Sequence, residues 1–166
     1  MMILSIILLI ISFLLQGLVS NFIGVNSSIF YTVYVLISLL IIYPHFENKK
    51  KYLILLFIFG LLMDLVYTNT TLLNVSLFFI IYYFSRMFHF FLPYNLLTIN
   101  ISNILSVFIY NIITFLMLVI LRVDSYSFIS LIKLLGSSIL MSIIFTSIVY
   151  WLVNYLKKRL DLKEVK

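Results

Sequence analysis

Asp64 has the greatest capacity for chemistry in this sequence, because it is an acidic residue inside a long apolar stretch. A carboxylate within a membrane span is energetically costly, so it usually faces water or the interior of a helix bundle. Three roles are open to it: a hydrated helix-terminal residue that caps or pairs locally, a hydrogen-bonding hub inside a bundle, or part of a proton relay. A relay needs further titratable groups at a similar depth, and the sequence offers none. We therefore favour the first two roles.

Gly60 precedes Asp64 by four residues, which places both residues on one face of a helix. A glycine at such a position lets a second backbone approach closely. The pair therefore predicts helix packing rather than catalysis.

Two later stretches carry polar residues at gaps of three and four, which align them along one side of a helix. In the first stretch these residues are Asn100, Asn103, Ser106, Tyr110 and Thr114. In the second they are Ser138, Ser142 and Thr146, preceded by Gly136 at the spacing that permits close helix contact. We expect both stripes to face protein and to hold helices together, and we weigh this role above a path for a substrate.

The residue types that support catalysis are not assembled into any known pattern. His45 and His89 lie in different predicted loops, and neither has the companion ligands of a metal site. Cysteine is absent, as are nucleophile-elbow, zinc-protease and phosphate-loop motifs. The sequence therefore predicts no enzyme, no metal and no cofactor.

The elements that position these residues must be membrane helices. Hydrophobic residues make up 64% of the 166 residues, charged residues only 10%, and the mean hydropathy is +1.24. Soluble domains carry about a quarter charged residues. We predict an all-α polytopic membrane protein, a single transmembrane helical bundle whose six spans cover about residues 3–20, 29–43, 52–67, 72–86, 96–121 and 128–156.

The ends of these spans follow from local signals. Pro44 ends the second span, and Pro93 disfavours a helical conformation at Leu92, so residues 87–95 are predicted to form an aromatic loop. The first span has no basic residue ahead of it, as a signal peptide would have, so we expect it to be retained.

Basic residues predict the orientation, because cytoplasmic loops retain positive charge. Placing both termini in the cytoplasm leaves only Arg122 and Lys133 on the outer side. The inner side then collects Lys49, Lys50, Lys51, Arg86, Lys157, Lys158, Arg159, Lys163 and Lys166. The net charge of +6 thus indicates membrane topology and not nucleic-acid binding.

The segment from Tyr52 to Arg86 resembles the signature region of the MreD family, the rod shape-determining membrane proteins of bacteria. That signature has a Gly-x-x-x-Asp on one helix, a short turn, a Leu-Leu-Gly-like element and a basic residue that closes the next helix. Gly60, Asp64 and Arg86 fall on these positions, with Leu72 and Leu73 between them. Asn74 stands where the family has its second glycine, and asparagine tolerates left-handed backbone better than most residues.

The resemblance implies a non-enzymatic scaffold of the cell-elongation complex in the bacterial cell membrane. The implied partner is MreC, with MreB filaments, a RodA-type polymerase and a class B penicillin-binding protein in the wider complex that makes peptidoglycan. Families of this kind are similar in architecture to substrate-binding subunits of energy-coupling-factor transporters.

That architecture leaves an alternative function, a small-solute binding subunit of such a transporter. It would need a polar pocket toward the outer side and a docking face of small residues on the first helix, which offers only Ser5, Ser12 and Gly17. A membrane enzyme of lipid chemistry ranks last, because the sequence lacks the acidic clusters that hold Mg²⁺ and phosphates.

Overall fold

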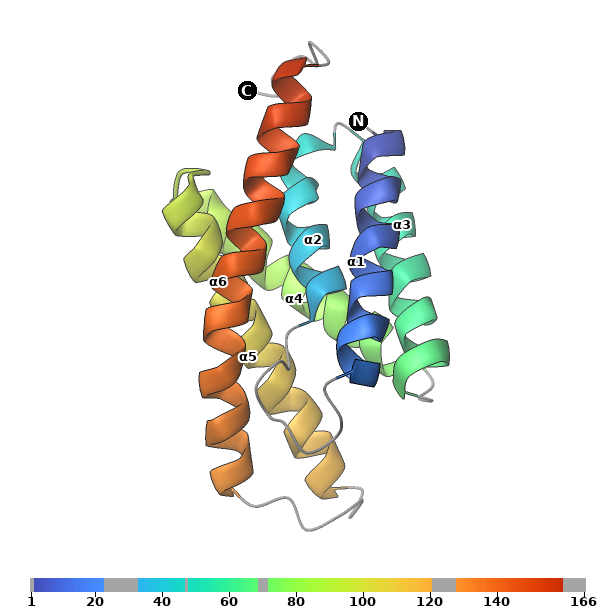
Figure 1. Ribbon diagram of the computed structural model, residues 1–166, viewed down its shortest axis with the longest axis vertical. Helices are drawn as coiled ribbons and strands as arrows, with labels where there is room; N and C mark the ends of the chain where they lie inside the picture. Colours follow the sequence, from blue (N-terminus) through green and yellow to red (C-terminus); the bar gives the residue numbers. More distant parts are fainter. Residues whose placement is uncertain (1, 23–32, 47, 69–71, 121–127, 160–166) are drawn as a thin grey trace.

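The computed structural model describes residues 2–22, 33–46, 48–68, 72–120 and 128–159, and helices account for nearly all of them (Figure 1). No strand occurs in these ranges, so the all-α prediction is confirmed for the described part of the chain. The α-helices are α1 (Met2–Phe22), α2 (Tyr34–Ile42), α3 (Lys49–Met63), α4 (Leu73–Phe91), α5 (Leu96–Ile120) and α6 (Phe128–Arg159). A 3-10 turn, η2 (Tyr43–His45), follows α2, and a π-helical turn, η3 (Asp64–Thr68), follows α3.

Four of these helices, namely α1, α3 with its π turn, α5 and α6, are long and apolar enough to cross a membrane. Helix α2 has nine residues, a length of about 14 Å, which is half of a hydrocarbon core of about 30 Å. Helix α4 has 19 residues, among them the polar residues Asn74, Arg86 and His89, and it is not one of these four. Within the described residues, the chain thus has four helices that are candidates for membrane spans by length and composition.

Two predicted boundaries differ from the structure by more than the others. The second helix begins at Tyr34 and not near residue 29, because Val33 has non-helical angles of φ −88° and ψ 85°; residues 29–32 lie outside the described ranges. Helix α4 continues to Phe91, so the loop predicted to begin at Met87 was wrong in its first half. Residues 87–92 contain no proline or glycine that would end the helix earlier. Leu92 is extended, with φ −120° and ψ 141°, as expected for the residue before Pro93.

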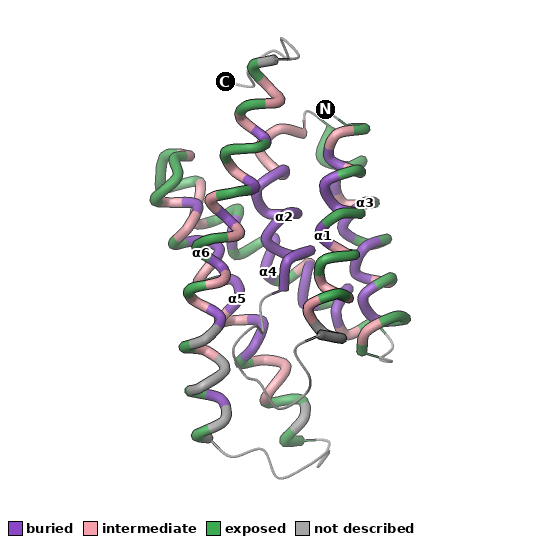
Figure 2. The backbone as a smooth tube through the Cα atoms, viewed as in Figure 1, coloured by how far each residue is buried: buried purple, intermediate pink, exposed green. Residues whose placement is uncertain are grey.

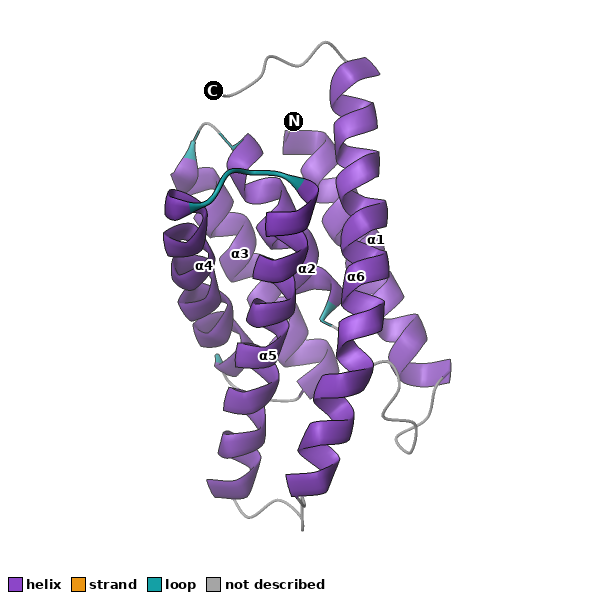
Figure 3. Ribbon diagram, turned by 90° about the vertical axis from the view of Figure 1, so that its left-hand side faces the viewer, coloured by secondary structure: helices purple, strands orange, loops and turns teal. Residues whose placement is uncertain are grey.

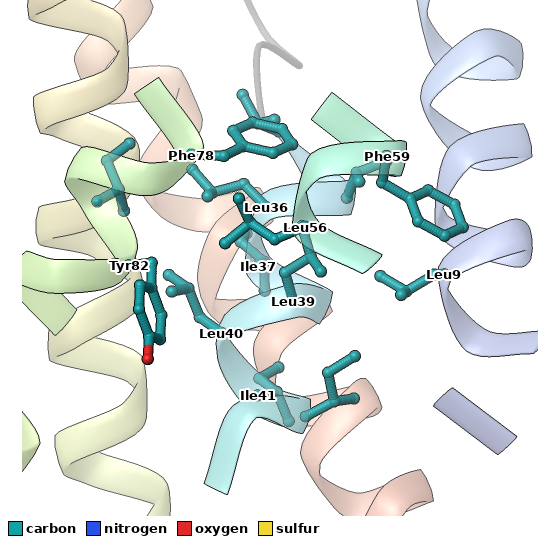
Figure 4. Packing of buried hydrophobic residues seen from close by; sticks show 14 of the residues in the cluster. Leu9, Leu36, Ile37, Leu39, Leu40, Ile41, Leu56, Phe59, Phe78 and Tyr82 are labelled. Carbon is teal, nitrogen blue, oxygen red and sulfur yellow. The ribbon is translucent and has the colours of Figure 1, made fainter. Parts of the chain in front are cut away.

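Helix α2 forms the centre of the bundle. Every residue from Tyr34 to Ile42 is buried, as a helix that is apolar all round should be. Figure 2 shows this helix as a buried rod, and it contacts α1, α4, α5 and α6. Its side chains meet residues of the surrounding helices, among them Leu9, Leu56, Phe59, Phe78 and Tyr82 (Figure 4).

The remaining helices pack as neighbours in the chain. Helix α3 lies against α4, α4 against α5, and α5 runs antiparallel beside α6 (Figure 3). Asn48 caps α3, because its side chain accepts a hydrogen bond of 3.0 Å from the Lys50 amide. Helix α1 begins, α3 begins and α6 ends at the same end of the bundle, so Lys50 and Lys158 share that end (Figure 1).

Candidate functional site

Gly60 brings the first turn of α4 against α3. A Cβ atom at this position would lie 2.9 Å from the Val75 Cα and 3.2 Å from the Val75 amide nitrogen. Since these are backbone atoms, any larger residue at position 60 would push the two helices apart. The sequence predicted this close approach, and the structure identifies the neighbouring backbone as that of α4.

Asp64, one turn after Gly60, caps the amino-terminal end of α4, the helix whose backbone packs against Gly60. Its Oδ1 accepts a hydrogen bond of 2.9 Å from the Asn74 amide, and its Oδ2 accepts one of 3.3 Å from the Val75 amide. These amides occupy the second and third positions of α4, which an N-cap side chain normally satisfies. Leu72, the N-cap residue of α4, makes no such bond, so a carboxylate from another helix replaces it.

The carboxylate is also well placed electrostatically. The amino-terminal end of a helix carries a partial positive charge, which favours a negative side chain there. Asp64 is only 1% exposed, so it is a hub inside the bundle and not a hydrated terminal residue. Of the two roles favoured from sequence, the structure therefore selects the hydrogen-bonding hub.

The backbone around this contact departs from regular helix at two points. Asp64 begins the π-helical turn η3, a distortion that is frequent at functional sites. Leu72 has a left-handed backbone, with φ 61°, and it is the one non-glycine residue of the described ranges with a positive φ. Asn74 itself lies inside α4, so the left-handed residue is Leu72, two positions earlier in the chain.

Asn74 extends the network to a third helix. Its fully buried side-chain Nδ2 donates to Asp64 Oδ1 at 3.1 Å and to Thr68 Oγ1 at 2.9 Å. Its Oδ1 accepts a short hydrogen bond from the Tyr110 hydroxyl of α5. The site therefore joins the end of α3, the start of α4 and the middle of α5.

Arg86, the fourth residue of the motif, lies apart from the other three. It is exposed near the far end of α4, 12 residues or about 18 Å along the helix from Asn74. The charge of its guanidinium acts on Tyr82, one turn earlier. The motif thus divides into a buried capping unit, Gly60, Asp64 and Asn74, and a separate basic residue.

The polar stripe predicted on α5 faces two neighbouring helices. Asn103 Nδ2 donates to Thr146 Oγ1 of α6 at 3.2 Å, whereas Tyr110 turns to α4. Ser106 and Ser142 are buried, and their hydroxyls have no hydrogen-bond partner among the described residues. The same holds for the buried hydroxyl of Thr114.

On α6, the small residues also differ from one another. Ser138 is buried and donates to the Leu135 carbonyl of its own helix at 2.8 Å. The close contact predicted at Gly136 was wrong, because a Cβ there would meet no atom of the described residues within 4 Å. Spacing alone could not show that this glycine lies on the outer side of α6.

The two histidines predicted to be isolated both pack against one tyrosine. The Tyr94 ring centroid lies 5.9 Å from that of His45 and 5.5 Å from that of His89, and the Tyr94 hydroxyl donates to the Ile41 carbonyl at 2.7 Å. Burial, together with the positive charge of Lys157, lowers the pKa of His45 to about 4. His89 lies within α4 and not in a loop.

Sequence reasoning missed Thr68 and the pairing of Tyr110 with Asn74. The polar residues after Asp64 indicated only a turn of the chain. The spacing of the polar residues on α5 indicated only that they lie on one side of that helix. In the described ranges, no three of the histidine, aspartate and glutamate side chains lie close enough to hold a metal ion. Set against models of protein families, curated proteins and solved structures, the chain has no match.

Proposed function

We propose that this chain is a non-enzymatic membrane scaffold of the MreD type. In this role it binds MreC in the bacterial cell membrane and helps to couple MreB filaments to peptidoglycan synthesis. The RodA-type polymerase and the class B penicillin-binding protein belong to the wider complex. The proposal concerns a protein that holds other proteins and performs no reaction of its own.

The observation that supports it is the capping unit of Gly60, Asp64 and Asn74. Gly60 and Asp64 carry the resemblance to the family, whereas Asn74 stands where the family has a glycine. The contacts of all three residues explain their positions. Glycine admits the backbone of α4, the aspartate one turn later caps that helix, and Asn74 ties both to α5. A carboxylate whose two oxygens accept backbone amides supports a role in building the bundle rather than in acid-base chemistry.

The proposal includes six membrane crossings with both termini in the cytoplasm. The short helix α2 is compatible with this, because all nine of its residues are buried by other helices. A helix that does not touch lipid need not match the thickness of the hydrocarbon core, and irregular backbone is tolerated at membrane depth where protein covers it.

The transporter alternative is less well supported. It requires small residues on the outer surface of α1, for docking to an energising subunit. Ser5 and Ser12 are buried, and the Ser12 and Ser38 hydroxyls lie 2.6 Å apart. A Cβ at Gly17 would lie 2.6 Å from the Tyr67 hydroxyl. The small residues of α1 thus serve contacts within the bundle.

The test of function is complementation in a rod-shaped host that lacks its own shape-determining gene of this type. The wild-type chain should restore rods and should co-purify with MreC, and Asp64→Leu should lose both, whereas Ser76→Ala, an exposed serine on the same turn of α4, should behave as wild type. Membrane levels of each variant are measured by a tag, so that loss of protein is separated from loss of binding. Round cells and no MreC association at wild-type protein levels would reject the proposal.

The topology has its own test, since the chain contains no cysteine and single cysteines can be introduced without background. A membrane-impermeant thiol reagent should leave Lys50→Cys and Lys163→Cys unlabelled in intact cells and should label Val123→Cys. Labelling of positions 50 and 163 from opposite sides would contradict two cytoplasmic termini.

A further inference from the structure

The outer face of α6 carries a row of exposed side chains near its carboxyl end, which change along the helix from aliphatic to aromatic to basic. Ile144, Ile148, Trp151, Tyr155 and Lys158 follow at gaps of four, three, four and three, so they lie on one side of the helix. The first four are between 46% and 67% exposed, and Lys158 is also exposed. These side chains remain exposed among the residues that the structure describes, and we call the row the α6 stripe.

The side chains of the α6 stripe change along the helix in the same order as the layers of a lipid leaflet, from acyl chains through the interface to the headgroups. Two isoleucines come first, two aromatic rings next and a lysine last. From Ile148 to Lys158 the helix rises about 15 Å, whereas half of a bilayer with its headgroups measures about 20 Å. Trp and Tyr prefer the level between acyl chains and headgroups, which leaves Lys158 at the level of the phosphate.

The aromatic rings form a flat surface. The ring centroids of Trp151 and Tyr155 lie 5.5 Å apart, and the ring planes are inclined by only 15°. Membrane helices that bind other helices present small residues, so that backbones approach closely. The α6 stripe presents bulky residues, and such a surface suits an acyl chain and its glycerol better than a second helix.

Lys158 differs from the lysine beside it. Lys157 is half-buried and lies near enough to His45 for its charge to act on that imidazole. Lys158 extends the exposed row instead. Only one of the two ammonium groups is therefore placed to meet a ligand on the aromatic surface.

We propose that the α6 stripe binds an anionic phospholipid in the leaflet at this end of the bundle. Its phosphate lies at Lys158, and its glycerol and upper acyl chain lie along the stacked rings. A cation at the headgroup level favours a lipid with net negative charge over a zwitterionic one by about fivefold. The proposal does not depend on the function proposed above, nor on which side of the membrane this end faces.

Trp151 provides a direct readout, because it is the only tryptophan in the chain. The purified full-length protein is reconstituted in vesicles in which a brominated phosphatidylglycerol or a brominated phosphatidylcholine replaces part of the matching lipid. Bromine on the acyl chain quenches tryptophan fluorescence only on contact. Wild-type protein should show quenching by the anionic lipid at about fivefold lower mole fraction than by the zwitterionic lipid.

The matched variants are Lys158→Gln and Lys50→Gln, each of which removes one exposed lysine at the same end of the bundle. The preference should fall toward equality in Lys158→Gln and should persist in Lys50→Gln. Equal quenching of the wild type by both lipids would overturn the proposal. An equal loss in both variants would also overturn it, because it would assign the preference to the general surface charge.

Discussion

Replacing Asp64 by leucine should remove the cap of α4 and should destabilise the whole bundle. The change deprives the Asn74 and Val75 amides of their acceptor, and it deprives the Asn74 side chain of one partner. Asp64 is 1% exposed, so water does not readily replace the carboxylate.

The expected size follows from these contacts. A buried amide without an acceptor costs about 1 to 3 kcal/mol, so two amides cost about 2 to 6 kcal/mol. A typical protein has a free energy of unfolding of about 5 to 15 kcal/mol, which makes this loss a large fraction of the total. Asp64→Asn retains one acceptor oxygen and should lose about half as much.

The assay is unfolding by sodium dodecyl sulfate in mixed micelles, followed by the loss of helical circular dichroism. Ser76→Ala serves as control, because this exposed serine bonds only to the Leu72 carbonyl of its own helix. Hydrogen exchange then locates the effect: amides in residues 73–77 should exchange faster in Asp64→Leu, while those in the middle of α6 should change less. A free energy of unfolding within about 0.5 kcal/mol of wild type would refute the capping role, since that is the usual range for surface changes.

Three further predictions concern other contacts. Gly60→Ala should lower the midpoint of thermal unfolding by forcing α3 and α4 apart, at a cost of about 1 to 3 kcal/mol, whereas Gly136→Ala, in open space, should raise it through better helix propensity; equal shifts would contradict the close approach. Asn103→Leu and Thr146→Val should show a coupling energy of about 0.6 kcal/mol in a double-mutant cycle, because the two side chains share a hydrogen bond. Strict additivity of the two changes in stability would rule that bond out. The folded-state pKa of His45 is about 4, below the ordinary 6.5, so the unfolded chain binds a proton first and stability should fall as pH drops from 6.5 to 4. His45→Gln should flatten that part of the pH profile, and an unchanged slope would exclude His45 as its source.

Much of the fold could be predicted from single residues and their spacing. The apolar runs determine an all-helical membrane protein, since backbone in hydrocarbon must satisfy its own hydrogen bonds. Pro44 and Pro93 determine where two helices end. Helical periodicity places Gly60 and Asp64 on one face.

Only the tertiary structure determines which neighbour each face meets. Helical spacing showed that Asp64 and Gly60 belong together, but it could not identify the Asn74 and Val75 amides as the groups that Asp64 caps. It grouped Tyr110 with residues that face α6, although the hydroxyl of Tyr110 reaches α4. In a chain whose helices are apolar on nearly every side, hydrophobicity does not distinguish a face that meets lipid from one that meets protein. That choice is made by how all the helices pack together around α2, which no local pattern encodes.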